Sequence, residues 1–357
     1  MFLIINLISK QACDEFPQQR GGNWVNLYHA IEFAHYDYLQ LGQYAMAKKM
    51  MSRMEKMILK LGGPQANSQT KLPDQHQLIW RYQRMEARQL LESVHGDYVF
   101  EDKFSVEEME KRYQLENISD ADIIYTATSV NGMLLLRVIH EAKFCSEDKK
   151  NSCNKNKIMN WAIKKSKKLI ENLESRKSIF YYTKASAKML NQVFLGIKDI
   201  AEYMRPHGLK CLTQKTCIAR KKKLSEFSSK ILKGPLKKAT KIQKDSMIRS
   251  SVTPTLLYMP SFEIYGYILL VLEKYQEAKE IFETSLDERM GRTLSLLGLA
   301  RSHAMLGNKK HADYFYQYLR TQLKDSDQEN MVVKEAENWS ETSKSSWDDW
   351  FWPYYLY

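Results

Sequence analysis

Apolar side chains recur three and four positions apart along much of this chain, which is the spacing of one face of an α-helix. The pattern is clearest from 262 to 319, where Leu272-Glu273-Lys274 and Leu306-Gly307-Asn308 each separate two such helices. An alanine follows each turn, Ala278 in the first copy and Ala312 in the second, 34 positions apart (312 − 278). This stretch therefore predicts two consecutive helix pairs, over 259–292 and 293–324.

A weaker copy of the same pattern lies near the start of the chain, over 28–61. The turn Leu41-Gly42-Gln43 separates its two helices, and Ala47 takes the position of the later alanines. His35 stands where the later pair has the small residue Gly266. We expect the bulk of this imidazole to weaken the packing of the first pair. Further helices are predicted at 75–94, 123–144, 158–174 and 179–204.

Composition supports a wholly helical protein. Only 14 glycines and 8 prolines occur in 357 residues, so residues that interrupt helices are scarce. No apolar run approaches the ~18–20 residues that a transmembrane helix needs. The five cysteines form no C-x-x-C pair, so we expect reduced thiols rather than a disulfide framework or a zinc site. These observations favour a cytoplasmic protein without a transmembrane segment.

Charge divides the chain unevenly. The stretch 143–250 contains 28 Lys and Arg but only 8 Asp and Glu, whereas the whole chain carries a net charge of +12. Such a basic segment could bind phosphates of RNA or an anionic membrane surface. An ordinary solvated helix surface explains the same composition. The candidate anion-binding residues are Lys164, Lys168, Arg220, Lys221, Lys222 and Lys223.

The last segment, 325–357, has the opposite character. It holds 8 Asp and Glu against 2 Lys, together with four of the seven tryptophans. The helical periodicity stops after Lys324, so we expect this acidic, Trp-rich tail to be disordered. A short element that docks on a basic surface or a helical groove, including the basic middle of the same chain, is the alternative.

Three stretches of this sequence are similar to those of a known family: Tyr28 to Phe33 with Tyr38 to Gln43, Ser251 to Pro254 with Met259-Pro260, and Glu263 to Leu270. With these stretches the chain resembles tetratricopeptide-repeat proteins, in particular a poorly characterised group with divergent N-terminal repeats. The resemblance implies an all-α fold of antiparallel helix pairs stacked as a TPR-like α-solenoid, or superhelix, over 27–324. The segment 1–26 would then be an N-terminal extension. The resemblance also implies a binding role and brings no catalytic residues.

In an array of this kind the first helix of each pair lines a concave groove. Helical spacing then places eight residues in it as candidates for binding a peptide: Glu32, Tyr36, Gln40, Glu263, Tyr267, Val271, Arg301 and Met305. Relatives that hold a terminal carboxylate use Lys and Asn at such places. The different residues here argue against that clamp and favour a helical or extended peptide.

Three functions remain open on this sequence. The first is a non-enzymatic scaffold or adaptor that binds a protein or peptide in the groove. The second is a basic adaptor for RNA or an anionic membrane through 143–249. The third is an enzyme whose site the sequence does not reveal. No nucleotide-binding, hydrolase or kinase motif occurs, and the eight histidines lack metal-ligand spacing, so we expect no cofactor and no metal.

Overall fold

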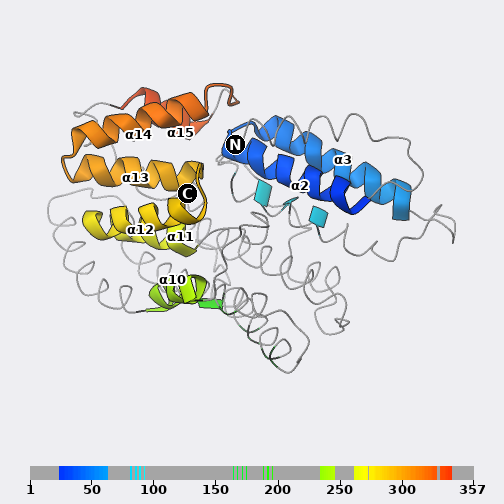
Figure 1. The fold of residues 1–357 in the computed structure, drawn as a ribbon, viewed down its shortest axis with the longest axis horizontal. Helices are drawn as coiled ribbons and strands as arrows, with labels where there is room; N and C mark the ends of the chain where they lie inside the picture. Colours follow the sequence, from blue (N-terminus) through cyan, green and yellow to red (C-terminus); the bar gives the residue numbers. More distant parts are fainter. Residues whose placement is uncertain are drawn as a thin grey trace, which may run out of the picture.

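A computed structural model of the chain describes residues 24–62, 234–245, 261–271, 273–327 and 330–339, with separate helical residues between 81 and 92 and between 164 and 195. Figure 1 shows eight labelled helices in this part of the chain. They are α2 (Trp24–Gln40), α3 (Tyr44–Gly62), α10 (Pro235–Asp245), α11 (Ser261–Val271), α12 (Tyr275–Glu288), α13 (Thr293–Met305), α14 (Lys309–Gln322) and α15 (Met331–Glu337).

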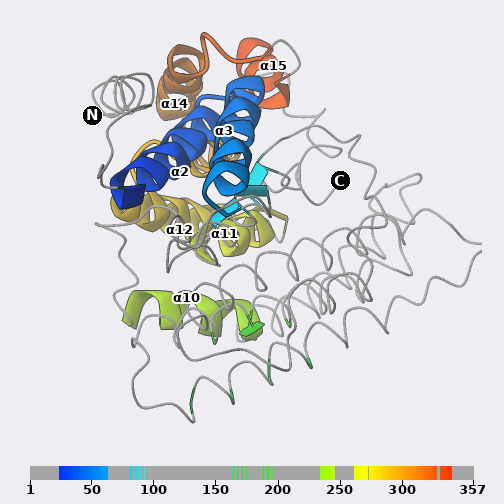
Figure 2. The same ribbon diagram turned by 90° about the vertical axis from the view of Figure 1, so that its right-hand side faces the viewer.

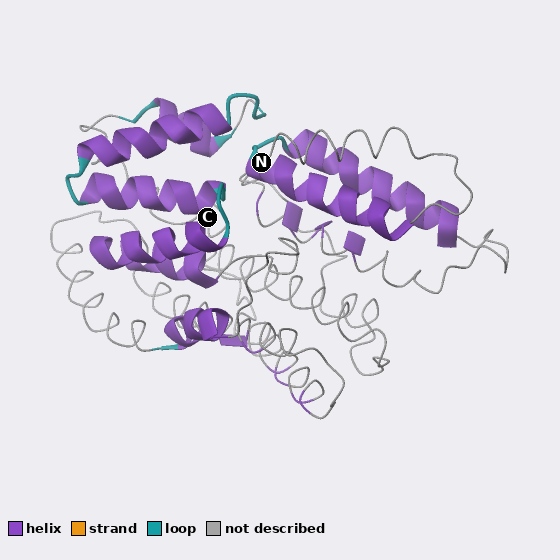
Figure 3. Ribbon diagram, in the orientation of Figure 1, coloured by secondary structure: helices purple, strands orange, loops and turns teal. Residues whose placement is uncertain are grey.

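The described residues are helical, with short turns and no strand, as the composition predicted (Figure 3). Helices α2 and α3 pack as one antiparallel pair, α11 and α12 as a second, and α13 and α14 as a third. The second and third pairs are themselves packed together through α12 and α13. The described residues therefore contain packed helix pairs at the predicted ranges 28–61, 259–292 and 293–324.

The three pairs share one turn geometry. Gly42, Glu273 and Gly307 each have a positive φ, of 67°, 58° and 76°. The next residue in each case donates its backbone N–H five positions back, for example from Asn308 to the His303 carbonyl at 2.9 Å. This left-handed residue with its backward hydrogen bond ends a helix and reverses the chain. Glu273 adopts this conformation without being a glycine, which sequence reasoning did not anticipate.

The core of the second and third pairs is built around Phe282 on α12. A Cβ atom added to Gly266 on α11 would lie 2.7 Å from the ring, and one added to Gly298 on α13 would lie 2.2 Å from it. The two glycines thus leave the space that the ring fills. Ala278 and Ala312 are fully buried at equivalent positions, as the spacing predicted. Helix α13 is buried from Thr293 to Ala304, because it is covered on several sides.

The α2–α3 pair, called here the N-terminal hairpin, has an apolar core of its own. Its buried members are Tyr28, Ile31, Ala34, Met50, Met54 and Met57, joined by Met85 from the helical residues between 81 and 92. His35 is accommodated in full burial, and its Nε2 lies 3.2 Å from Gln89 Oε1. Burial lowers the pKa of His35 to about 3, with a further contribution from the charge of Arg88, so the imidazole is neutral.

Helix α15 lies within the acidic segment that the sequence marked as a tail. Val332 and Ala336 are fully buried against the preceding helices, and Asn330 caps the helix by accepting a hydrogen bond from the Val332 N–H at 2.9 Å. The Trp339 ring stacks on Tyr316 of α14 at 4.8 Å between centroids. Residues 330–339 are thus folded onto α14 rather than disordered. The rest of the tail, 340–357, and the segment 1–23 lie outside the described residues.

Two parts of the chain that are far apart in sequence lie side by side. Figure 2 shows the N-terminal hairpin beside α11–α15. The contact is made by the α2–α3 turn: the Asp327 N–H donates to the Gly42 carbonyl at 3.0 Å, and the Ala45 N–H donates to Asp327 Oδ2 at 2.9 Å. The side-chain amide of Asn330 lies 3.5 Å from the Tyr44 hydroxyl. This contact positions the site described next.

Candidate functional site

All eight candidate groove residues lie on α2, α11 and α13, and most are buried. Glu32, Tyr36, Gln40, Glu263, Tyr267 and Arg301 are each at most 4% exposed. Met305 is half-buried at the end of α13, and the side chain of Val271 lies outside the described residues. The buried six contact other residues of the chain, so their side chains are not open to a partner in this conformation. Their role in binding a peptide stays a prediction.

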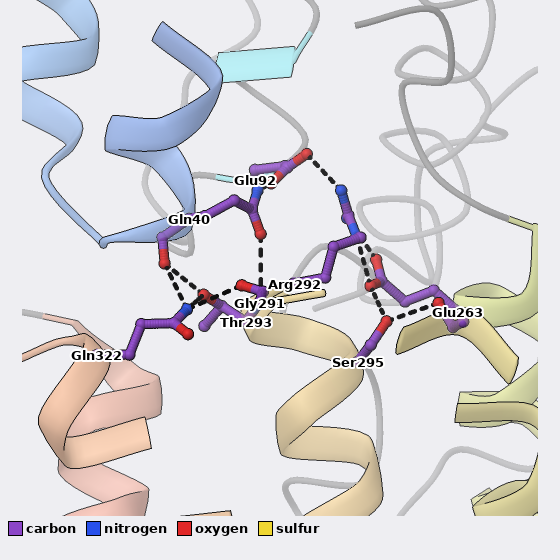
Figure 4. Close-up of polar contacts among 9 residues, drawn as sticks. Gln40, Glu92, Glu263, Gly291, Arg292, Thr293, Ser295 and Gln322 are labelled. Atoms are coloured by element: carbon purple, nitrogen blue, oxygen red, sulfur yellow. Dashed lines mark hydrogen bonds and ion pairs between the residues drawn. The ribbon is translucent and has the colours of Figure 1, made fainter. Parts of the chain in front are cut away.

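Arg292 is the centre of a buried polar network at the start of α13 (Figure 4). Its Nε and Nη2 donate to the two carboxylate oxygens of Glu263 on α11, at 2.9 and 2.7 Å. Its Nη1 donates to Glu92 Oε1 at 3.2 Å, and Glu92 comes from the helical residues beside the N-terminal hairpin. Ser295 donates a further hydrogen bond to Glu263 at 2.7 Å. One guanidinium therefore joins two carboxylates from distant segments.

Electrostatics keep this arginine charged. Burial alone lowers the pKa of a guanidinium, but the carboxylates of Glu263 and Glu92 hold the pKa of Arg292 well above its usual range. Arg289 is also buried nearby, and its pKa is lowered, mainly by burial and also by the charges of Arg292 and Arg88. Arg292, Arg289 and Arg88 thus bring three positive charges to a region where Glu263 and Glu92 supply two negative charges.

Gln40 links the same network to the end of the hairpin. Its Oε1 accepts from the Thr293 N–H at 3.1 Å, and its side-chain amide donates to Glu92. The carbonyl of Gln40 accepts from the Thr293 hydroxyl and from the side-chain amide of Gln322 on α14, the latter at 3.0 Å. Gln322 also donates to the Gly291 carbonyl at 3.0 Å. The last residue of α2 is thereby tied to the first turn of α13.

Two further buried ion-pair networks involve groove candidates, one on α2 and one on α13. On α2, the Glu32 carboxylate pairs with Arg81, whose guanidinium lies over the Tyr28 ring at 4.5 Å. On α13, Arg301 pairs with the Glu335 carboxylate of α15, which also accepts from the Tyr316 hydroxyl at 2.9 Å. Tyr267, another buried groove candidate, donates its hydroxyl to the Leu294 carbonyl at 2.7 Å. Burial raises the pKa of this phenol, so it acts as a hydrogen-bond donor.

The chemistry of these groups is that of structural ion pairs. Glu92 and Glu263 converge, as catalytic carboxylates do, but both are held by Arg292. No group of three or more His, Cys, Asp and Glu side chains that could hold a metal ion occurs among the residues that the structure describes. In the same part of the chain, no helix is long and apolar enough to cross a membrane.

The candidate anion-binding residues are only partly described. Lys164 is exposed, whereas Lys168 and the run Arg220 to Lys223 lie outside the described residues. Helix α10 falls in the same basic segment. Its buried side carries Ala239 and Thr240, and three lysines are exposed: Lys237, Lys238 and Lys241.

Sequence reasoning missed most of the residues that form the Arg292 network. Glu92, Arg292 and Thr293 carry no local signal, because each bonds to a residue about 200 or more positions away. A polar residue in an otherwise apolar helix pattern is the only hint available. Gln40 and Glu263 were singled out, but as residues of an open groove.

The chain was compared with protein-family models, with curated proteins and with solved structures. No family model matches the chain, and no curated protein or solved structure is detectably similar to it.

Proposed function

We propose that this chain is a non-enzymatic helical-repeat scaffold that binds a protein or a peptide partner. The supporting observation is the shared construction of its three described pairs. Each has a left-handed residue at the same place in the turn, and each has a fully buried alanine, Ala47, Ala278 or Ala312, where its second helix crosses the first. Repeated pairs of this kind stack into an extended TPR-like array whose first helices share one face. That face is the proposed binding surface.

Partner binding is best tested by site-specific crosslinking in the full chain. A photo-crosslinking amino acid at Met305, the half-buried groove candidate on α13, should couple to a partner protein that mass spectrometry identifies. The same group at Tyr314, which is 61% exposed on α14, serves as the control position. Coupling from Met305 but not from Tyr314 would support the proposal. No coupled protein at either position, or equal coupling at both, would contradict it.

A second candidate function is anion binding by the basic segment 143–249. The three exposed lysines of α10, together with exposed Lys164 and Lys167, are the observation that favours it. Changing Lys237, Lys238 and Lys241 together to Gln should then weaken retention on immobilised RNA in a salt-dependent manner. The matched control changes three exposed lysines outside the segment to Gln: Lys309, Lys310 and Lys324. Equal losses would indicate net charge alone.

A further inference from the structure

Helix α14 carries exposed aromatic side chains. The helix packs on α13 and α15 (Figure 1) and leaves Tyr314 and Tyr318 61% and 44% exposed. Residues four positions apart are neighbours on a helix surface, so the two rings form one stripe along α14. No other Phe, Tyr or Trp side chain that the structure describes is exposed to this degree.

The stripe continues into further rings. Phe315, which is half-buried, lies edge-on to Tyr314 at 5.1 Å between centroids and stacks on His303 of α13 at 5.5 Å. Tyr314, Phe315 and Tyr318 are called here the aromatic face. Single exposed apolar residues are common on protein surfaces, whereas contiguous ones mark places where something binds.

The chain passes close to the aromatic face before it reaches 340–346. Trp339 stacks on Tyr316 and donates its Nε1–H to Asp313 Oδ1 at 2.8 Å, and Asp313 immediately precedes Tyr314. The seven residues 340–346 are all polar and can span up to about 23 Å. Helix α14 has 14 residues and is therefore about 21 Å long. The chain beyond 346 can thus reach either end of α14.

The segment 347–357 matches the aromatic face in composition. Seven of its eleven residues are aromatic: three Trp, one Phe and three Tyr. Aromatic rings bury large apolar areas and attract one another in edge-on and offset arrangements. The segment also contains Asp348 and Asp349, and exposed Lys310 lies four positions before Tyr314 on the same stripe of α14. Rings and charges are therefore both complementary.

We propose that the segment 347–357 binds the aromatic face of α14 within the same chain, with its rings on Tyr314 and Tyr318 and its acidic pair beside Lys310. The bound segment extends the packing that Trp339 begins. This inference does not depend on the scaffold function, because α14 is the second helix of its pair and the proposed partner surface is formed by first helices.

Crosslinking within the full chain tests the contact directly. A photo-crosslinking amino acid at Tyr318 should couple to 347–357 of the same molecule, which mass spectrometry of proteolytic peptides identifies. The matched control position is Leu59 on α3, which is 64% exposed. Coupling from Tyr318 but not from Leu59 would support the proposal. Equal coupling from both would overturn it, because the segment would then contact any exposed apolar residue. Coupling between two molecules, seen as a doubled mass, would overturn binding within one chain.

Protection from chymotrypsin provides a second measurement. Tyr314→Ser combined with Tyr318→Ser removes both rings of the stripe. Cleavage within 347–357 should then become about tenfold faster, because the protease cuts molecules whose segment is unbound. Leu59→Ser combined with Met290→Ser is the matched control, since it removes two other exposed apolar side chains, and its cleavage rate should equal that of the wild type.

The remaining outcomes are equally decisive. Unchanged cleavage in the tyrosine variant, or equal acceleration in both double variants, would overturn the proposal. Faster cleavage only when Lys237, Lys238 and Lys241 are changed to Gln would place the segment on the basic middle of the chain instead. If the tyrosine variant does not fold, the crosslinking at Tyr318 decides. None of these results changes the expected coupling at Met305, so failure here leaves the scaffold function standing.

Discussion

Asp327 Oδ2 accepts a hydrogen bond from the backbone N–H of Ala45 at 2.9 Å, across 282 residues of chain. Ala45 lies in the first turn of α3, where backbone N–H groups have no partner within the helix. The carboxylate therefore caps α3 in the way that an N-cap residue caps its own helix, but from the other end of the protein. The same residue uses its backbone N–H to hold the Gly42 carbonyl.

Removing this cap should lower the stability of the whole chain. We expect Asp327→Ala to decrease the free energy of unfolding by about 1 kcal/mol, the usual effect of losing a cap. Urea unfolding followed by circular dichroism measures it. Asp325→Ala, at an exposed neighbouring position, should change stability by less than about 0.5 kcal/mol. Equal effects of the two variants would show that Asp327 contributes only general charge.

Gly298 should be intolerant of any side chain. In Gly298→Ala the new Cβ would lie 2.2 Å from Phe282 Cζ, so we expect a loss of about 1–3 kcal/mol from overpacking. Gly307→Ala provides the comparison, because nothing lies within 4 Å of its Cβ position and only its φ of 76° is strained. That variant should lose about 1 kcal/mol.

The double variant Gly298→Ala/Phe282→Leu identifies the cause of the loss. A smaller side chain at 282 removes the clash, so the two changes should be non-additive in thermal unfolding. Additive losses would mean that the Phe282 ring is not what excludes a side chain at Gly298.

The described helix pairs were predictable because their signals are local. Turn residues, apolar spacing and the alanines at 47, 278 and 312 are all read within a window of one helix pair. The contact between the N-terminal hairpin and the C-terminal helices was not predictable, because hydrogen bonds such as that of Ala45 to Asp327 join residues that are 282 positions apart in the sequence. Helix α15 was missed for a related reason: seven residues are too few to show a period.

The groove candidates show where periodicity misleads. Helical spacing correctly put Gln40 and Glu263 on first helices of their pairs, and a solvated groove was the natural interpretation of polar side chains there. Both are buried, because Arg292 and Thr293 supply partners that spacing does not reveal. Polar type alone does not distinguish an exposed residue from a buried and paired one.

Asp37 on α2 should make stability fall as the pH rises. Burial raises the pKa of its carboxyl to about 7, from 3.8 in a solvated chain. The folded state therefore retains a proton that the unfolded state has lost, and stability decreases between about pH 4 and pH 7. Asp37→Asn removes this dependence and should stabilise the protein by about 2–4 kcal/mol at pH 8.

The measurement is urea unfolding of both proteins at pH 4.5 and pH 8, at about equal ionic strength. The variant and the wild type should differ least at the lower pH, where the carboxyl is protonated when folded. An equal difference in unfolding free energy between variant and wild type at the two pH values would show that the pKa of Asp37 is not raised.

His35 should act in the opposite direction. Its pKa is lowered to about 3 by burial and by the charge of Arg88, while a solvated histidine titrates near 6.5. The unfolded state therefore takes up a proton that the folded state does not, and stability is lost as the pH falls from about 6.5 toward 3. His35→Gln, which cannot titrate, should lose less stability over this range, whatever its stability at pH 7. Thermal unfolding at half-unit intervals from pH 7 to pH 4 compares the two, and ¹⁵N-detected titration of the imidazole reports the pKa directly. An imidazole that titrates near 6.5 in the folded protein would contradict the burial of His35 beside Gln89, and with it the packing of the first helix pair.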